Sequence, residues 1–220
     1  MPEEFTTPQS IAEEVTNFLR RQLLMGKRFP PGSFIREAEV ADELHISRSP
    51  VREALKTLES HGVVKTLPRR GAVVLDYSRE EMDEIYDVRI LLEMKIYSHI
   101  VEAGLLTDEH YEWLMACMGR FCEVNRVFEE SHEKGQLQFF DIDSEFHFYI
   151  HDMARLPWTT ELLKKTYSRL YQFRIRRIGK EDLDRLVKFH RAIVDNLRSG
   201  DLKALKNVRI ESYLVGKAYN

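Results

Sequence analysis

Residues 45–58 read HISRSPVREALKTL, and this stretch decides the fold because it places short hydroxyl residues and two arginines at the start of a helical pattern. Ser47 is a residue type that caps helix N-termini, and Pro50 suits the first turn. Apolar residues at helical spacing then predict a buried face formed by Val51, Ala54, Leu55 and Leu58. Arg48 and Arg52 are four residues apart, so they project together from the opposite face.

The flanking segments predict two more helices and a β-hairpin. Residues 10–25 carry apolar groups at helical spacing, and residues 26–34 interrupt this helix with two glycines and two prolines. Residues 36–45 form a short amphipathic helix, and the break before the next helix is only HIS. In the valine-rich residues 63–77, a Pro-Arg-Arg-Gly turn separates two apolar runs, which predicts a hairpin. Helices and hairpin in this order outline a winged helix-turn-helix.

Composition and charge favour an ordinary globular protein with one local basic surface. The chain is 43% hydrophobic and 31% charged, and its 220 residues are enough for two domains. The net charge is only −3, but six basic residues stand against two acidic ones between Ser47 and Gly71. We find no signal segment and no apolar run of about 18 residues, and Cys117 and Cys122 make no disulfide framework. We therefore expect a cytoplasmic protein that does not contact a membrane.

From Ser78 onward the sequence predicts helices only. Apolar residues recur every three or four positions, and six such segments joined by short loops predict an all-α antiparallel bundle. The expected helices cover residues 85–96, 114–128, 139–153, 162–178, 183–197 and 202–219, and one expected break is SHEKGQ, residues 131–136. The fold class is therefore mainly α, with a first domain at residues 1–77 and a second at residues 78–220.

The basic stretch contains the residue types that DNA recognition requires. A helix N-terminus favours phosphate through its free N–H groups and dipole, and arginine can donate two hydrogen bonds to guanine. The expected DNA contacts are Arg48 and Arg52 in the groove, Ser47 and Ser49 on phosphates, Arg69, Arg70 and Gly71 at the wing tip, and Arg36 on the flanking backbone. The alternative is one solvated helix face followed by a basic turn.

One cluster in the second domain can bind a metal ion. Asp143 and His147 are four residues apart, hence on one helical face, and a carboxylate and an imidazole at this spacing can share a metal ion. His190 joins them if its helix packs against theirs. Two alternatives stay open, namely that His190 is a core histidine and that Asp143 and His147 form a hydrogen-bonded pair. His151, one turn further on, either extends this face or points to solvent.

Residues 10–76 resemble the DNA-binding domain of the GntR family of bacterial transcription regulators. The resemblance rests on the segments REAEVA, SRSPVREAL and RRGAVV. In that family, the positions that match Arg36, Arg48, Arg52 and Gly71 touch DNA, and hydroxyl groups near Ser47 and Ser49 contact phosphates. The resemblance also implies a homodimer on a short palindromic site in double-stranded DNA, because a two-fold protein matches a two-fold sequence.

Residues 78–220 resemble the FCD effector domain of the FadR-like subfamily, through YDVRILLE, DSEFH, FHRAI and SGD. Many such domains bind zinc or nickel through one aspartate and three histidines, and small carboxylates can complete the site. Asp143, His147 and His190 match three of these ligands. Ser212 stands at the fourth position, with Glu211 beside it. Whether Glu211 or His151 replaces the missing ligand is left open.

We therefore consider two kinds of ligand for the second domain. In one, a divalent metal ion such as zinc, nickel or manganese is held by three protein ligands, and a carboxylate completes the site. In the other, an organic ligand binds without metal. Arg89 matches a family arginine that faces the pocket and can pair with a carboxylate. Its alternative role is a helix-surface ion pair with Glu93, four residues on.

Together these features predict a ligand-responsive transcription regulator, a repressor acting as a homodimer, with no catalytic residues. One alternative is a metal-dependent hydrolase that uses Asp143, His147 and His190, but we find no nucleophile elbow or phosphate loop. Turnover of simple esters or amides would favour that alternative. The other alternative is an architectural DNA-binding protein with an inert helical domain, which effector-independent binding and little sequence preference would favour.

Overall fold

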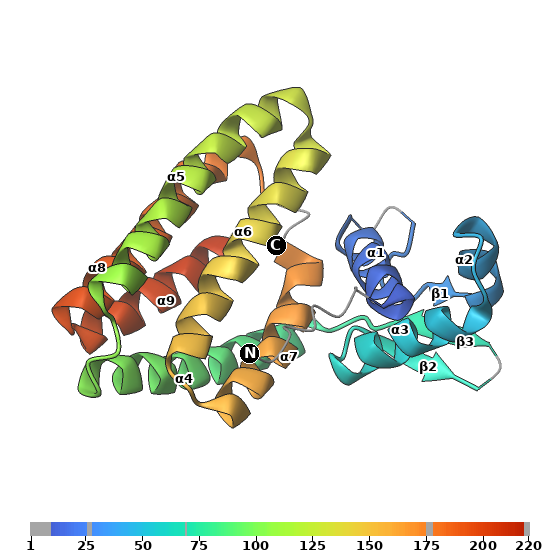
Figure 1. The fold of residues 1–220 in the computed structure, drawn as a ribbon, viewed down its shortest axis with the longest axis horizontal. Helices are drawn as coiled ribbons and strands as arrows, with labels where there is room; N and C mark the ends of the chain where they lie inside the picture. The colour runs from blue at the N-terminus through green and yellow to red at the C-terminus, as the bar shows by residue number, and fades with distance from the viewer. Residues whose placement is uncertain (1–9, 26–27, 69, 175–177, 218–220) are drawn as a thin grey trace, which may run out of the picture. The chain divides into compact units, whose positions relative to one another are not determined.

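The computed structural model describes residues 10–25, 28–68, 70–174 and 178–217. The described residues form nine helices and a three-stranded antiparallel sheet (Figure 1), which confirms the mainly α fold class. The chain divides between Tyr77 and Ser78 into two compact units. The first contains the winged helix-turn-helix and the second contains only helices.

The first unit is built around a helix-turn-helix. Its elements are α1 (Ile11–Met25), β1 (Phe34–Ile35), α2 (Glu37–Glu43), α3 (Arg48–Ser60), β2 (Val64–Leu67) and β3 (Gly71–Val74). The predicted apolar face of α3 is fully buried, and it packs with residues of α1, α2 and the sheet in one core. This core includes Leu19, Leu23, Ile35, Val40, Val51, Leu55, Leu58 and Val64. The short turn between α2 and α3 contains His45, whose φ is +53°.

The wing has one more strand than the hairpin predicted from the sequence. The strand order is β1-β3-β2, and Ile35 of β1 pairs with Ala72 of β3. Gly71 begins β3 with a φ of +96°, and a Cβ atom there would lie 2.0 Å from the carbonyl oxygen of Ile35. Glycine is therefore required where β1 joins the hairpin, because a side chain would separate the two strands.

The second unit is a bundle of six helices, as predicted. They are α4 (Arg79–Glu102), α5 (Asp108–Glu130), α6 (His132–Met153), α7 (Pro157–Arg174), α8 (Lys180–Ser199) and α9 (Leu202–Lys217). α5 packs against α6 and α8, and α4 packs against α7 and α9 (Figure 1). The bundle core includes the fully buried Tyr97, Phe121, Phe139, Phe146 and Tyr167. α4 starts at a capping box in which Ser78 and Glu81 satisfy each other's backbone N–H groups.

The break expected over residues 131–136 is wrong in extent, because only Ser131 separates α5 from α6. Ser131 has extended backbone angles, and its hydroxyl accepts a hydrogen bond from the backbone N–H of Lys134, which starts the next helix at once. Gly135 lies inside α6, where a Cβ atom would be 2.4 Å from the Phe128 ring. This glycine allows close helix packing instead of ending a helix. The C-terminal parts of the expected helices at residues 175–177 and 218–219 lie outside the described residues.

The contact between Gly71 and Ile35 predicts a specific loss of stability. Gly71→Ala should lower the free energy of unfolding by more than about 2 kcal/mol, since a left-handed residue with a side chain costs about 1–2 kcal/mol before any steric clash. Gly32→Ala is the matched control, because Gly32 has a φ of +79° but no atom within 4 Å of a Cβ. Urea denaturation of both variants measures the difference, and equal losses would contradict the proposed clash.

Candidate functional site

The N-terminus of α3 is exposed and its backbone donors are not capped by a side chain. Ser47 occupies the N-cap position with φ −74° and ψ 163°, and its hydroxyl makes no capping hydrogen bond. Ser47, Arg48 and Ser49 are all exposed. The first N–H groups of α3, the hydroxyl groups and a guanidinium are thus presented on one surface, which suits a phosphate group.

Arg52 lies on the same exposed side and is held in place by α2. Its Nε and a terminal nitrogen donate to the carboxylate of Glu37 at distances of 2.8–3.2 Å. The hydrogen bond and the negative charge of Glu37 raise the pKa of Arg52. Arg36, at the N-cap of α2, is exposed and donates to Glu39 at 2.8 Å. Both arginines are therefore oriented by acidic residues at the start of α2.

The structure describes two of the three residues expected at the wing tip. Arg70 is exposed next to β3. Arg69 lies outside the described residues. Gly71 is buried, and the pairing of β1 with β3 already requires a glycine there; its contact with DNA stays a prediction.

Asp143, His147 and His190 converge in the second unit. Their candidate ligand atoms lie within 4.8 Å of one another, and all three side chains are largely buried. Nε2 of His190 is 2.9 Å from Oδ1 of Asp143, whereas Nε2 of His147 is 3.8 Å from it. The second distance is too long for a hydrogen bond, so the structure does not support the alternative in which Asp143 and His147 form a hydrogen-bonded pair. His190 on α8 is the partner of Asp143.

The hydrogen bonds of His190 fit a metal site. Its Nδ1 is 2.7 Å from the carbonyl oxygen of Leu186, which can only accept, so Nδ1 carries the hydrogen. Nε2 then faces the Asp143 carboxylate. The lone pair on Nε2 would repel the carboxylate oxygen unless a hydrogen or a metal ion lies between the two atoms. A histidine that donates through one ring nitrogen to a carbonyl oxygen and binds metal with the other is the usual arrangement in metalloproteins.

The distances between the candidate ligand atoms also fit a metal ion. Two ligands of a tetrahedral zinc ion are about 3.4 Å apart, and the distances from Asp143 to His190 (2.9 Å) and to His147 (3.8 Å) lie on either side of this value. Burial lowers the pKa of His147 well below its usual value, and Arg209 and His190 lower it further. His147 is therefore neutral at physiological pH, which is the form that binds metal.

A buried ion network lies beside these residues. Glu93 of α4 accepts hydrogen bonds from Arg89 at 3.0 Å, from Arg209 of α9 at 2.7 and 3.1 Å, and from the hydroxyl of Tyr167 of α7 at 2.7 Å. Burial would raise the pKa of Glu93, but Arg209 and Arg89 outweigh it and lower the pKa to about 2. The Arg89–Glu93 pair considered from the sequence therefore exists, but it is buried and not on the helix surface.

Arg209 and Tyr167 were not identified from the sequence. Arg209 is 3% exposed, although its segment, KNVRIESYL, carries no feature that distinguishes it from a surface arginine. The only available signal was the spacing of Arg89 and Glu93, which reveals half of the network. The second arginine comes from a helix more than 100 residues further along the chain, as the Arg209–Glu93 separation of 116 residues shows.

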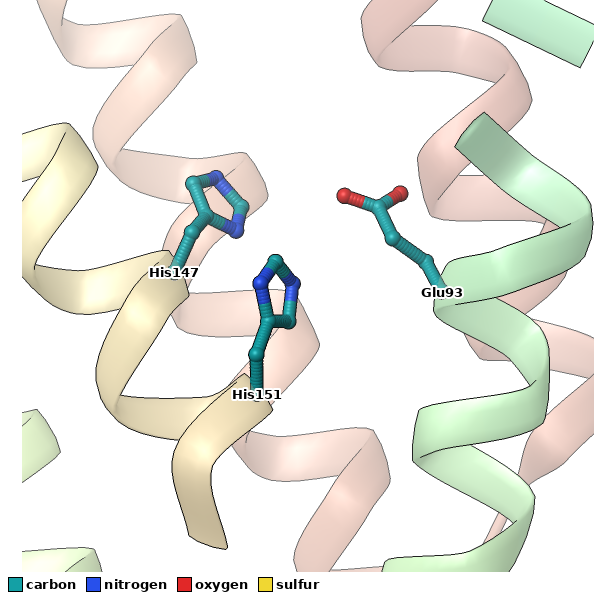
Figure 2. Close-up of side chains that lie close together, drawn as sticks. All are labelled: Glu93, His147 and His151. Carbon is teal, nitrogen blue, oxygen red and sulfur yellow. The ribbon is translucent and has the colours of Figure 1, made fainter. Parts of the chain in front are cut away.

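His147 also belongs to a second buried group, with Glu93 and His151. Figure 2 shows the two histidines projecting from one helix toward Glu93 on another. His151 is fully buried, so it does not point to solvent, and neither of its ring nitrogens has a hydrogen-bond partner. A metal ion at this second group is disfavoured, because the Glu93 carboxylate already accepts from two positively charged arginines.

A small cavity of about 30 Å³ adjoins the first group. Its lining includes Asp143, His147 and His190, together with Arg89, Arg209, Ser212 and several apolar side chains. Ser212 of α9 is 4% exposed. Glu211 is exposed, and His151 does not line the cavity. Neither residue is therefore placed to replace Ser212 as a ligand.

The comparisons with known proteins match each of the two units to a protein family. A family of bacterial regulatory proteins, the gntR family, matches residues 11–74, and the FCD domain matches residues 84–209. The gluconate operon transcriptional repressor of Bacillus subtilis (strain 168) is 28% identical over 206 residues, which are 91% of this chain and 81% of that protein. An uncharacterized HTH-type transcriptional regulator in an unstable DNA locus of Streptomyces ambofaciens is 30% identical over 190 residues, which are 83% of this chain and 73% of that protein.

The fold is also similar to a solved structure, that of E. coli McbR/YncC. The TM-score is 0.76 at 21% identity, and the match covers 97% of this chain and 100% of that chain. The matching families and relatives are transcription regulators and not enzymes, so the hydrolase alternative has no support from them. Among the described residues, no helix is long and apolar enough to cross a membrane.

The burial of His151 predicts how stability depends on pH. Burial lowers the pKa of His151 from 6.5 to about 3, so the unfolded chain binds a proton that the folded chain excludes. The free energy of unfolding is therefore not reduced by this residue above about pH 6.5. It falls as the pH drops below 6.5, by about 2 kcal/mol at pH 5 from this residue alone. His151→Leu should remove this loss, so its free energy of unfolding should gain on the parent between pH 7.5 and 5. Urea denaturation at both pH values measures the gain, and parallel behaviour of the two proteins would contradict the assignment.

Proposed function

This chain belongs to the GntR family of bacterial regulatory proteins and carries an FCD domain, and on this premise we propose that it is a ligand-responsive transcriptional repressor. It reads DNA with the first unit, and the second unit senses a small carboxylate, a divalent metal ion, or both. The observation that carries the proposal is the convergence of Asp143, His147 and His190 beside a cavity in the unit that does not read DNA. The word repressor in the name of the Bacillus relative supports the direction of regulation.

The DNA contacts of the proposal are those of α3 and its neighbours. Arg48 and Arg52 read base edges in the major groove, and Ser47 and Ser49 contact phosphates with the N–H groups of α3. Arg36, Arg69 and Arg70 contact the flanking backbone and minor groove. The exposure of Ser47, Arg48 and Ser49, and the orientation of Arg52 by Glu37, support these assignments.

A homodimer is the second part of the proposal. The helical unit has large apolar side chains in contact with water, among them Leu91 of α4 at 71% exposure and Trp158 of α7 at 80%. Val88 and Leu162 are also exposed on these two helices. Exposed apolar groups of this size are typical of an association surface, and a symmetric dimer buries the same surface twice.

The sensing site is the third part. Asp143, His147 and His190 would hold a divalent ion, which would attract carboxylate oxygens when bound. Arg89 and Arg209 carry two positive charges beside it against the single negative charge of Glu93, which favours an anionic ligand. An architectural DNA-binding protein would have no need of such a buried polar cluster, so this alternative is less well supported.

We expect Arg48→Ala and Arg52→Ala each to weaken binding to the preferred DNA by about 1–3 kcal/mol and to relax base preference, because each removes a base contact. The preferred DNA is selected by the protein from a random duplex pool, and it should be an inverted repeat if the protein binds as a homodimer. Arg191→Ala, an exposed arginine of α8, is the matched control. Unchanged affinity in both α3 variants would exclude this helix as the reader.

Metal content tests the sensing site. Untagged protein purified without chelators should contain about one equivalent of zinc, nickel or manganese per chain, and His147→Ala should lose it because three ligands become two. Elemental analysis of both proteins gives the answer, with His132→Ala, outside the cluster, as the control. Absence of metal from the parent protein, even after incubation with each ion, would leave only an organic ligand for the cavity.

A further inference from the structure

We propose that Glu37 sets the DNA specificity of the first unit: it occupies one edge of the Arg52 guanidinium and cancels its charge, so that Arg52 binds a base well and a phosphate group poorly. The proposal rests on the base contact that the proposed function gives to Arg52. It adds that the preference for one site over other DNA depends on a residue of α2, which lies outside the recognition helix.

The first support is the geometry of the ion pair. The Glu37 carboxylate accepts hydrogen bonds from Nε of Arg52 at 3.1 and 3.2 Å and from its Nη2 at 2.8 Å. A guanidinium has five N–H groups, and a pair of this kind uses those along one edge. Among the described residues, none accepts from the other edge, which is formed by Nη1 and the outer hydrogen of Nη2. Two N–H groups on that edge match the O6 and N7 atoms of guanine.

The second support is the exposure of the two side chains. The Arg52 side chain is 57% exposed, whereas that of Glu37 is 18% exposed. The arginine is therefore accessible to DNA, and the carboxylate that holds it is the more sheltered partner. A two-point arginine–carboxylate pair is stronger than an ordinary surface ion pair, so Glu37 restricts the directions in which Arg52 can donate. This orientation exists before DNA binds, which lowers the entropy lost on binding.

The third support is the charge that DNA meets at this position. Non-specific binding depends almost entirely on positive side chains that neutralise phosphates. Arg52 and Glu37 together have no net charge, so the pair is only weakly attracted to a phosphate. Arg52 can act as a full cation only if it leaves Glu37 and loses the two-point hydrogen bonding. A guanine edge can bind without this loss, because it uses the other edge of the guanidinium.

The composition of α2 is consistent with this role. Four of its seven residues are acidic and none is basic. Glu39 accepts a hydrogen bond from Arg36 at 2.8 Å. Glu43 accepts one from Arg28. These carboxylates reduce the positive charge that the first unit offers to phosphates. Of the three ion pairs, only the one with Arg52 joins α2 to the recognition helix α3.

The experiment compares two affinities of the full chain at several salt concentrations. One is for the preferred duplex, selected from a random pool, and the other is for a scrambled duplex of equal length and composition. Glu37→Gln removes the charge and keeps the shape of the side chain. It should strengthen binding to the scrambled duplex and steepen the plot of log affinity against log salt by about 0.9, the effect of one more phosphate contact. The ratio of the two affinities should fall at least about fivefold, the lower end of what a two-point arginine–guanine contact contributes.

Glu39→Gln is the matched control. It removes the same charge from the same helix but releases Arg36, which is proposed to contact only the DNA backbone and minor groove. It should change both affinities by the same factor, so that their ratio stays at the parent value.

Arg52→Lys is a second test of the same idea. It keeps the positive charge, but an ammonium group cannot present one edge to Glu37 and another to a base. The ratio should fall by a factor similar to that in Glu37→Gln. Urea denaturation shows which variants are folded, and Arg52→Lys replaces Glu37→Gln if the latter is not.

Combination with Arg52→Ala shows whether Glu37 acts through Arg52. In that background Glu37→Gln should leave the ratio unchanged, because there is no guanidinium to orient. An equal fall of the ratio with and without Arg52 would overturn the proposal. Equal changes of the two affinities in Glu37→Gln would overturn it as well, while Arg52 would remain a reader. Unchanged binding of the preferred duplex by Arg52→Ala would overturn the base contact of the proposed function itself.

Discussion

The packing of the helical unit depends on the ionic and hydrogen-bonding interactions of one buried carboxylate, that of Glu93. It joins three helices, because Arg89 lies on its own helix α4, Tyr167 on α7 and Arg209 on α9. A carboxylate without these partners would be very costly in this core, and each arginine would be equally costly without the carboxylate. The network also fixes α9, and therefore Ser212, relative to α4. The shape of the cavity thus follows from one fully buried negative charge.

The metal-binding group is positioned by different means. Asp143 and His147 come from neighbouring turns of α6, so helix geometry alone places them together. His190 is brought to them by the packing of aromatic side chains: its ring contacts Phe121 and Phe146, with ring centroids 4.5 and 4.9 Å away. The cluster is therefore polar at its centre and aromatic around it, which excludes water and strengthens the electrostatic interactions inside.

Much of this arrangement follows from local patterns in the sequence, but its long-range ionic part does not. The helix periodicities predicted α3 and the six-helix bundle, and the spacing of Asp143 and His147 predicted two of the three residues of the metal-binding group. The partnership of Glu93 with Arg209 could not be predicted, since no local rule says which arginine of many is buried. Gly135 misled the prediction for a related reason: a glycine that ends a helix and a glycine that permits contact with Phe128 look alike in sequence. Strand β1 has only two residues and lacks a usable pattern.

The pairing of β1 with β3 has a consequence for how this regulator can diverge. The buried Gly71 and its neighbours set the position of the wing through contacts inside the protein, whereas Arg70 beside them is exposed to solvent. Mutations at this exposed position can therefore change the DNA contact proposed for Arg70 with little cost in folding. Under the proposed function, the residues that hold the wing in place and the residue proposed to contact DNA are different, so binding preference can change while the fold is retained.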